Sequence, residues 1–360
     1  MKFILKDKCR VRSDPKSLVI SPAKKRSVLK MLLISLAVLF LVALVLIGWF
    51  VISLFSEPDM TKLPGYHPFK SATAREQYLT YYNTRAKSWP VASEAKYVET
   101  SFGKTFVRIS GPVNAPVLVL LPSVSASSLI WLPNVKTLSE NYRVYAVDNI
   151  YDVGLSIYTR PITSSDDLVN WLDELFIVLN LGDQINLMGL SFGGWITNQY
   201  ALHFPQRLHK IVLAAPVATV FPLPGEWVWR GILSATGSRY VMKKVMINWA
   251  FQDLARKQDN ASRKAVEEII DDALMGLKCF KFKMPVMPTV LTDQEWQLMN
   301  VPVLFLVGEH EVIYSAQAAV RRLNTLAPNT VTEIIPNAGH DLTIVQAEMI
   351  NRKVIEFLSK

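Results

Sequence analysis

Cysteine is almost absent from this chain, since its 360 residues include only Cys9 and Cys279. The two lie on opposite sides of a long apolar segment, so we expect no disulfide between them. No Cys or His spacing typical of a metal site occurs, and a disulfide framework or a zinc module is excluded as the basis of the fold. Charged residues are also few, at 19%, while half of the residues are hydrophobic, which argues against a disordered chain.

Net positive charge is almost absent outside one short segment, although the formal net charge of the chain is +9. Residues 1–30 hold ten Lys or Arg against two Asp, which accounts for eight of these charges and leaves about one for the other 330 residues. A nearly neutral globular part excludes a general polyanion-binding surface, so we expect no nucleic-acid partner.

One long hydrophobic run is present, and residues 31–55 contain no charged side chain. At 1.5 Å per residue, a helix of this length spans the ~30 Å hydrocarbon core of a bilayer with some tilt. A cleaved signal peptide is the alternative, but the run is longer than usual and lacks a small-residue cleavage pattern. We therefore predict an uncleaved membrane anchor behind a basic cytoplasmic tail, residues 1–30. The positive-inside rule then places the later residues outside the cytoplasm.

After this segment, residues 56–96 read as a linker followed by a helix over residues 72–89, and strands alternate with helices from residue 97 to residue 360. Ser164 or Ser165 is a plausible N-cap for one of these helices. Most strands are continuously apolar, which is typical of a mainly parallel sheet with helices on both faces. The expected strands are 97–100, 106–110, 117–121, 142–148, 185–190, 208–215, 303–307 and 331–335.

The alternation stops between about residues 217 and 299. This stretch is helical in pattern and rich in Trp and Phe, so it is an insertion between two strands. Additional packing layers would explain it. We favour a cap over a functional site, because we expect the insertion to leave and rejoin the sheet at one edge.

A strand-to-helix turn carries the clearest chemical signal. Gly189, Leu190, Ser191, Phe192 and Gly193 form a G-x-S-x-G that follows a buried strand and opens a helix. The glycines allow a tight turn, which would hold the Ser191 hydroxyl above the sheet as a nucleophile. A serine needs an adjacent base to react at neutral pH.

Only five histidines are available as that base. His340 follows the last strand, at the same expected sheet edge as Ser191, and it is our candidate. Glu311 lies in the loop after the preceding strand and is our candidate for the carboxylate that orients the imidazole, with Glu309 as its rival. The backbone N–H of Phe192 would be one oxyanion donor, and the loop that begins Pro122-Ser123-Val124 would supply another.

From about residue 97 to residue 360 the chain resembles the α/β-hydrolase superfamily, in particular bacterial membrane-anchored carboxylesterase-like serine hydrolases. The resemblance rests on the Ser191 turn, residues 120–131, residues 142–148, Gly308 to Glu311, and Gly339-His340. It implies that the second oxyanion donor is the Val124 N–H. Two features differ from the usual pattern: Pro122-Ser123 stands where His-Gly is common, and the acid is Glu rather than Asp.

These observations predict a membrane-anchored serine hydrolase that cleaves a carboxylic ester, lipid-like or otherwise apolar, through an acyl-enzyme. No metal or organic cofactor is implied. Peptidase, thioesterase, C–C hydrolase and haloperoxidase reactions share these motifs, and a non-catalytic membrane-tethered binding protein on the same fold is the alternative from another class.

Overall fold

The structure is a computed structural model that describes residues 22–56, 59–281 and 286–360. It divides into two compact units, Met1–Leu54 and Phe55–Lys360. Most of the predicted basic tail (residues 1–21), residues 57–58 of the linker and residues 282–285 of the insertion lie outside the described residues.

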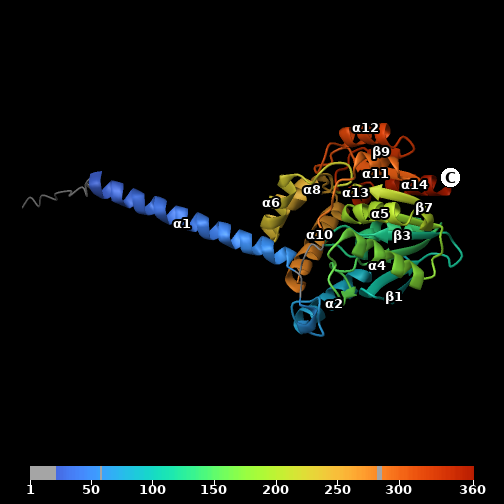
Figure 1. The fold of residues 1–360 in the computed structure, drawn as a ribbon, viewed down its shortest axis with the longest axis horizontal. Coiled ribbons are helices and arrows are strands. Elements are labelled where there is room, and N and C mark those ends of the chain that lie inside the picture. Colours follow the sequence, from blue (N-terminus) through green and yellow to red (C-terminus); the bar gives the residue numbers. More distant parts are fainter. Residues whose placement is uncertain (1–21, 57–58, 282–285) are drawn as a thin grey trace, which may run out of the picture. The chain divides into compact units, whose positions relative to one another are not determined.

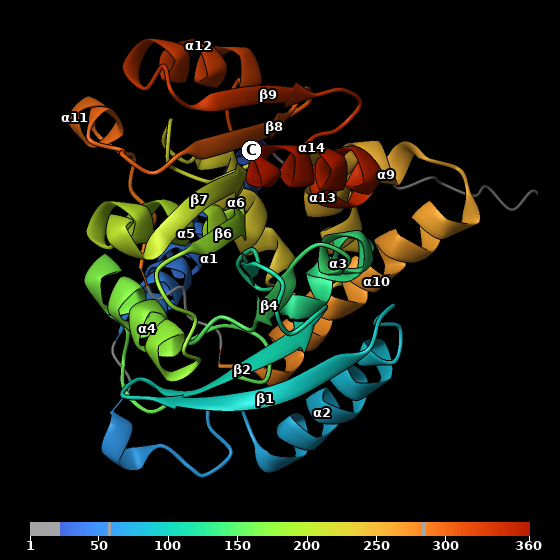
Figure 2. The ribbon, with the colours of Figure 1, turned by 90° about the vertical axis from the view of Figure 1, so that its right-hand side faces the viewer.

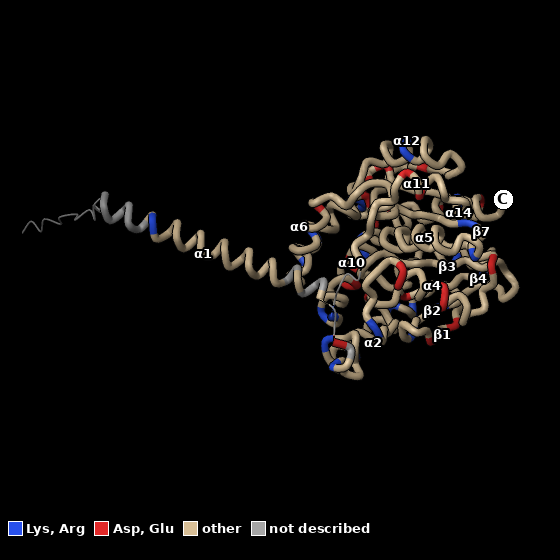
Figure 3. Tube along the Cα trace, in the orientation of Figure 1, with Lys and Arg blue, Asp and Glu red and all other residues tan. Residues whose placement is uncertain are grey.

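The first unit contains helix α1, Pro22–Phe55 (Figure 1). Its segment Leu29–Trp49 is long and apolar enough to cross a membrane, and none of that segment is buried. No charged residue follows Lys30 along this helix, and Figure 3 shows most of its described length in tan, without Lys, Arg, Asp or Glu. Such a segment near the N-terminus has the length and composition of either a membrane span or a signal sequence.

The second unit is built on one sheet, which has nine strands among the described residues, in the order β1-β2-β4-β3-β6-β7-β8-β9, with β5 paired to β2. Strands β3, β4, β6, β7, β8 and β9 are mutually parallel, while β1, β2 and β5 add antiparallel pairs at one side. The predicted mainly parallel α/β sheet is therefore confirmed. The strands are β1 Ser93–Thr100, β2 Gly103–Ser110, β3 Val117–Leu121, β4 Arg143–Val147, β5 Ile157–Tyr158, β6 Ile185–Leu190, β7 Leu208–Ala214, β8 Val303–Gly308 and β9 Val331–Ile335.

Helices cover both faces of this sheet, and Figure 2 shows α4 and α5 on one side of the strands and α3 and α14 on the other. Alternate strand residues supply the two cores: Leu118 and Leu120 of β3 face one helix layer, and Val119 and Leu121 face the other. The helices of this unit are α2 Ala72–Ala86, α3 Leu132–Ser139, α4 Ser165–Val178, α5 Phe192–His203, α6 Gly225–Ser234, α7 Arg239–Met242, α8 Asn248–Ala250, α9 Gln252–Arg256, α10 Asn260–Cys279, α11 Asp293–Gln297, α12 Ala316–Leu326, α13 Leu342–Val345 and α14 Ala347–Ser359.

Local sequence explains several of these boundaries. Ser164 caps α4, because its side chain accepts a hydrogen bond from the backbone N–H of Asp167, 3.1 Å away. The same seryl hydroxyl and the Asp167 carboxylate form a capping box. Strands β1 and β2 form a hairpin that turns through Ser101-Phe102, and Gly103 already belongs to β2.

The insertion between β7 and β8 consists of helices α6 to α11. It leaves the sheet at the carboxyl end of β7, where Ser191 also lies. It does not rejoin there as expected: β8 is parallel to β7, with Ile211 beside Val303, so its amino end lies at the opposite edge. A parallel connection must cross the sheet in this way.

The segment that precedes α2 is attached to the last long helix of the insertion. Phe69 forms an antiparallel bridge with Phe280, just after α10, and their rings are 4.6 Å apart. The N–H of Lys70 donates to the carbonyl of Cys279, 2.8 Å away. The linker and the insertion are therefore joined by backbone contacts.

Candidate active site

Ser191 occupies the turn between β6 and α5 in a backbone conformation that is rare for a serine, with φ 54° and ψ −112°. Such a conformation destabilises the folded state by about 1–3 kcal/mol and persists only where the surrounding structure holds it. Its N–H donates to the carbonyl of Ala214, 2.9 Å away, and its own carbonyl accepts from Trp195. A side chain at Gly189 or Gly193 would overlap neighbouring backbone, so both glycines are required by close approach.

Three side chains from three strand ends meet above the sheet. The hydroxyl oxygen of Ser191, after β6, lies 2.9 Å from Nε2 of His340, which follows β9. Nδ1 of the same ring lies 3.0 Å from Oε2 of Glu311, which follows β8. Parallel strands bring their carboxyl ends to one edge, which explains how residues 149 positions apart come together.

The imidazole and the carboxylate are buried, with 5% and 0% of their side-chain surface exposed. The other oxygen of Glu311 accepts hydrogen bonds from the N–H groups of Val312 and Ile313 at 2.9 and 3.0 Å. Burial lowers the pKa of His340, but the charge and hydrogen bond of Glu311 and the charge of Asp341 together outweigh it, so the pKa lies above its ordinary value. The ring can therefore hold a proton beside a charged partner.

Glu309, the rival carboxylate, lies away from the imidazole of His340. Its side chain is 46% exposed, and one of its oxygens accepts a hydrogen bond from the backbone of Asn337. The structure brings Glu311 and not Glu309 to His340. Position in the loop alone did not separate the two, although the spacing from Gly308 favoured Glu311.

The two predicted oxyanion donors both border the space above Ser191. The Phe192 N–H opens α5, and Val124 lines the same cavity as the serine. Within the described part of the chain, neither N–H is hydrogen-bonded to another protein atom. Both are free to bind a developing oxyanion.

A carboxylate that sequence reasoning missed supports the loop containing Val124. Both oxygens of Asp152 accept from the N–H of Ser125 at 3.1 Å, and one also accepts from Val153 at 2.7 Å. Ser125 has a positive φ of 60°, so this loop is held in an uncommon conformation. Burial raises the pKa of Asp152 to about 7, despite these N–H donors. Its place just after a strand was the signal available in the sequence.

A cavity of about 260 Å³ opens onto Ser191 and His340. The insertion forms part of its wall, and the ring of Trp227 in α6 lies edge-on to the His340 ring, with centroids 5.8 Å apart. Apolar residues of the lining include Val124, Leu129 and Met246. The lining also contains a charged group, in which Arg85 pairs with Glu268 and Asp272.

The remaining histidines each have a partner outside this group of three residues. His67, expected in an open linker, is instead buried, and burial lowers its pKa to about 4. The contacts are His67 with the ring of Tyr158, His203 with Asp166, His209 with Asn186, and His310 with Asp253. Across the described ranges, no group of three or more His, Cys, Asp or Glu residues is arranged to hold a metal ion.

A nucleophile turn after a parallel strand, with its partners at two later strand ends, is the arrangement of α/β-hydrolases. The chain belongs to the alpha/beta hydrolase family, whose sequence model matches residues 118–352. This confirms the resemblance drawn from the motifs.

Curated relatives of high similarity come from Bacillus subtilis (strain 168). Carboxylesterase YbfK is 34% identical over 291 residues, which cover 81% of this chain and 96% of the relative. The uncharacterized carboxylesterase nap is 33% identical over 298 residues, covering 79% and 92%. The crystal structure of naproxen esterase from Bacillus subtilis has a TM-score of 0.71 and 31% identity, covering 80% of this chain and 99% of that one.

Proposed function

We propose that this protein is a membrane-anchored carboxylesterase that uses Ser191, His340 and Glu311 as its catalytic triad. The observation that carries the proposal is the chain of two hydrogen bonds, from the Ser191 hydroxyl to His340 and on to Glu311, beside a cavity. The named carboxylesterases among the relatives support the ester-cleaving activity.

The reaction follows from this geometry. As the Ser191 oxygen attacks the ester carbonyl, Nε2 of His340 accepts the hydroxyl proton, and the carboxylate of Glu311 stabilises the imidazolium. The Phe192 and Val124 N–H groups bind the oxyanion. When the tetrahedral intermediate collapses, the imidazolium gives its proton to the departing alcohol and leaves an acyl-enzyme. Water, deprotonated by the same imidazole, then releases the acid and restores the serine.

The size and lining of the cavity support a small, predominantly apolar ester. A volume of about 260 Å³ lies near the lower end of ligand pockets, and most of the lining side chains are apolar. The charges of Arg85, Glu268 and Asp272 in the lining are paired with one another, so they do not call for a charged substrate.

The proposal includes anchoring by residues 31–55, with the hydrolase domain at 97–360, a cap at about 217–299 and the catalytic domain on the extracytoplasmic side. It is supported by the apolar helix and by the ten basic residues that precede it. An anchor would keep the enzyme close to lipid-like esters.

Covalent labelling by a fluorophosphonate, combined with turnover of p-nitrophenyl esters, tests the activity. We expect the wild-type protein to be labelled and Ser191→Ala to be unlabelled, with kcat lowered by about 10⁴-fold or more. Circular dichroism should be unchanged, because the hydroxyl contributes little packing. A wild-type protein that neither reacts nor turns over any ester would instead indicate a binding protein on the hydrolase fold.

A further inference from the structure

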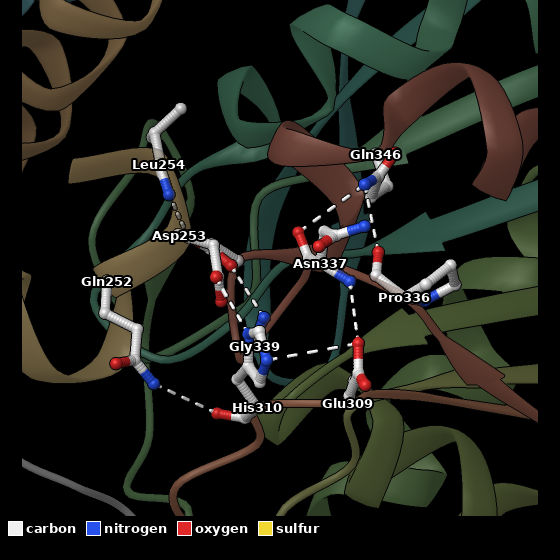
Figure 4. Close-up of polar contacts among 10 residues, drawn as sticks. Gln252, Asp253, Leu254, Glu309, His310, Pro336, Asn337, Gly339 and Gln346 are labelled. Carbon is white, nitrogen blue, oxygen red and sulfur yellow. Dashed lines mark hydrogen bonds and ion pairs between the residues drawn. The ribbon is translucent and has the colours of Figure 1, made fainter. Parts of the chain in front are cut away.

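Helix α9 of the insertion contacts the loop that carries Glu311 (Figure 4). Nε2 of Gln252 donates to the backbone carbonyl of His310, 3.3 Å away. Oδ1 of Asp253 lies 2.9 Å from Nδ1 of the His310 ring. Two consecutive residues of α9 therefore hold both the backbone and the side chain of the residue directly before Glu311.

The next residue of α9 contacts the loop that carries His340. The N–H of Leu254 donates to Oδ2 of Asp341 at 2.9 Å, and Oδ1 of that buried carboxylate accepts from the N–H of Gly339 at 3.0 Å. Asp341 and Gly339 flank His340. Through the Asp341 side chain, the same short helix is thus linked to the residues on both sides of the proposed base.

The two loops are also packed directly on each other. The N–H of His310 donates to the carbonyl of Ala338, 2.9 Å away. Gly308 lies so close to Ala338 and Gly339 that a Cβ there would overlap their backbone. A displacement of one loop must therefore be transmitted to the other, because no space separates them.

The Asp253 carboxylate depends on His310 because it is nearly buried and has few other partners. The Asp253 side chain is only 10% exposed, and among the described residues its second oxygen, Oδ2, has no hydrogen-bond partner. The charge of Asp341 lies nearby. On the other side of the His310 ring, Oε2 of Glu309 is 3.9 Å from Nε2. A nearly buried carboxylate with one partner depends strongly on that partner.

We infer that α9 is a clasp that sets the distance between Glu311 and His340, with Asp253 and His310 as its positioning residues. The inference rests on the proposed function, since the triad is what the clasp would position. Neither residue touches the reacting atoms, and seating of the cap is thereby coupled to assembly of the triad.

Simple attachment of the cap and positioning of the triad have different consequences. Attachment alone would change the melting temperature or KM. Burial lowers the pKa of His340, and the contact with Glu311 and the charge of Asp341 together raise it above its ordinary value. Positioning changes the contact with Glu311. A loosened contact should lower kcat and move the acid limb of the kcat/KM profile to lower pH.

The test uses the full-length chain in detergent micelles and compares Asp253→Asn, His310→Gln and the double variant. Small misplacements of catalytic groups lower rates by one to two orders of magnitude, so we expect kcat for a p-nitrophenyl ester to fall about 10-fold or more. KM should change little. The double variant should lose no more than either single variant, because both remove one interaction.

A matched control comes from a second His–Asp pair in the same domain. Asp166 Oδ1 lies 3.3 Å from His203 Nε2, at the end of α5 away from Ser191. Asp166→Asn should leave kcat within about 2-fold of wild type, as is usual for an exposed pair. Gln252→Ala, which removes only the bond to the His310 carbonyl, is a milder second clasp variant that should shift kcat in the same direction.

A spectroscopic readout separates failure of the clasp from failure of the proposed activity. The proton between His340 Nδ1 and Glu311 should give a low-field ¹H resonance that does not depend on turnover. We expect it to shift or disappear in Asp253→Asn and to persist in Asp166→Asn. If the wild type is labelled by a fluorophosphonate while the clasp variants retain kcat, the acid limb and this resonance, the inference is wrong. A wild type without ester turnover would refute the activity, and the resonance would still decide whether the clasp exists.

Discussion

Glu309 and Glu311 are two residues apart in one loop but differ completely in surroundings. The Glu311 side chain is buried and contacts His340, whereas Glu309 is largely exposed. Glu311→Gln keeps a hydrogen bond but loses the charge that stabilises imidazolium, so we expect kcat to fall at least about 100-fold at neutral pH. Glu309→Gln should change kcat by less than about 5-fold, as expected of a solvated charge.

Steady-state kinetics of both variants, with circular dichroism to show folding, checks this ranking. The reverse order would transfer the role to Glu309. Two nearly silent variants would mean that the carboxylate partner of His340 lies elsewhere.

We expect His340, as the proposed base, to set the acid limb of the pH profile. The base must be neutral to accept a proton; burial lowers its pKa, but the contact with Glu311 and the charge of Asp341 raise it above the ordinary 6.5. We therefore expect kcat/KM to be lost as pH falls through a value above 6.5. Glu311→Gln removes the charge of Glu311, so the residual activity should have its acid limb below that of wild type. Identical limbs would contradict the coupling of the two side chains.

Asp152 should give the folded domain an unusual dependence on pH. Burial raises its pKa to about 7, against 3.8 for an unperturbed carboxyl. Between these two values the folded state binds more protons than the unfolded state, so the free energy of unfolding falls as pH rises from about 4 to about 7. Asp152→Asn lacks this fall. Urea unfolding at about pH 5 and pH 8 checks this: the free energy of unfolding of wild type should fall more between the two pH values than that of the variant. Equal changes in both proteins would contradict the prediction.

At the scale of elements, α6 of the insertion presents two tryptophans in different directions. Trp227 lines the cavity beside His340, while Trp229 is 45% exposed. An aromatic pair contributes about 0.5–1.5 kcal/mol beyond its buried area, so removing the cavity wall should weaken substrate binding. We expect Trp227→Ala to raise KM for aromatic esters by about 3–10-fold, and Trp229→Ala to leave it unchanged. Equal effects would indicate that the helix acts only through its stability.

The sequence predicted elements well where the pattern was local and strong. Buried strands with short connections, the turn at Ser191 and the cap residue Ser164 all follow from neighbouring residues. The two-residue strand β5 was missed, because Ile157 and Tyr158 are too few for a periodic signal. The prediction that the insertion rejoins the sheet at the edge where it leaves was also wrong.

Contacts across long sequence separations explain what could not be predicted at the site. The clasp joins Asp253 to His310, which are 57 positions apart, and no local pattern marks α9. Asp152 acts on Ser125 from another loop, 27 positions away. In contrast, Ser191, His340 and Glu311 were found together because each follows a recognisable strand.

At the scale of the whole molecule, ten basic residues precede the apolar helix and only Lys62 follows closely. If the helix is an anchor, this asymmetry orients it with the N-terminus inside. We expect protease added outside spheroplasts to degrade the domain after Phe55 and to spare residues 1–30. An epitope tag at each end, detected by immunoblot, checks this result. Cleavage of the N-terminal tag alone would indicate the reverse orientation.

The bridge between Phe69 and Phe280 also has a mechanical consequence. Any tension applied through the N-terminal part of the chain must pass along residues 64–70 before it reaches α2 and the sheet. The bridge and the adjoining bond from Lys70 to Cys279 would bear part of that load, at the end of α10. If the N-terminal helix is anchored, a pull on the chain would thus reach the insertion, whose helix α10 lines the cavity of Ser191, before it reached the sheet.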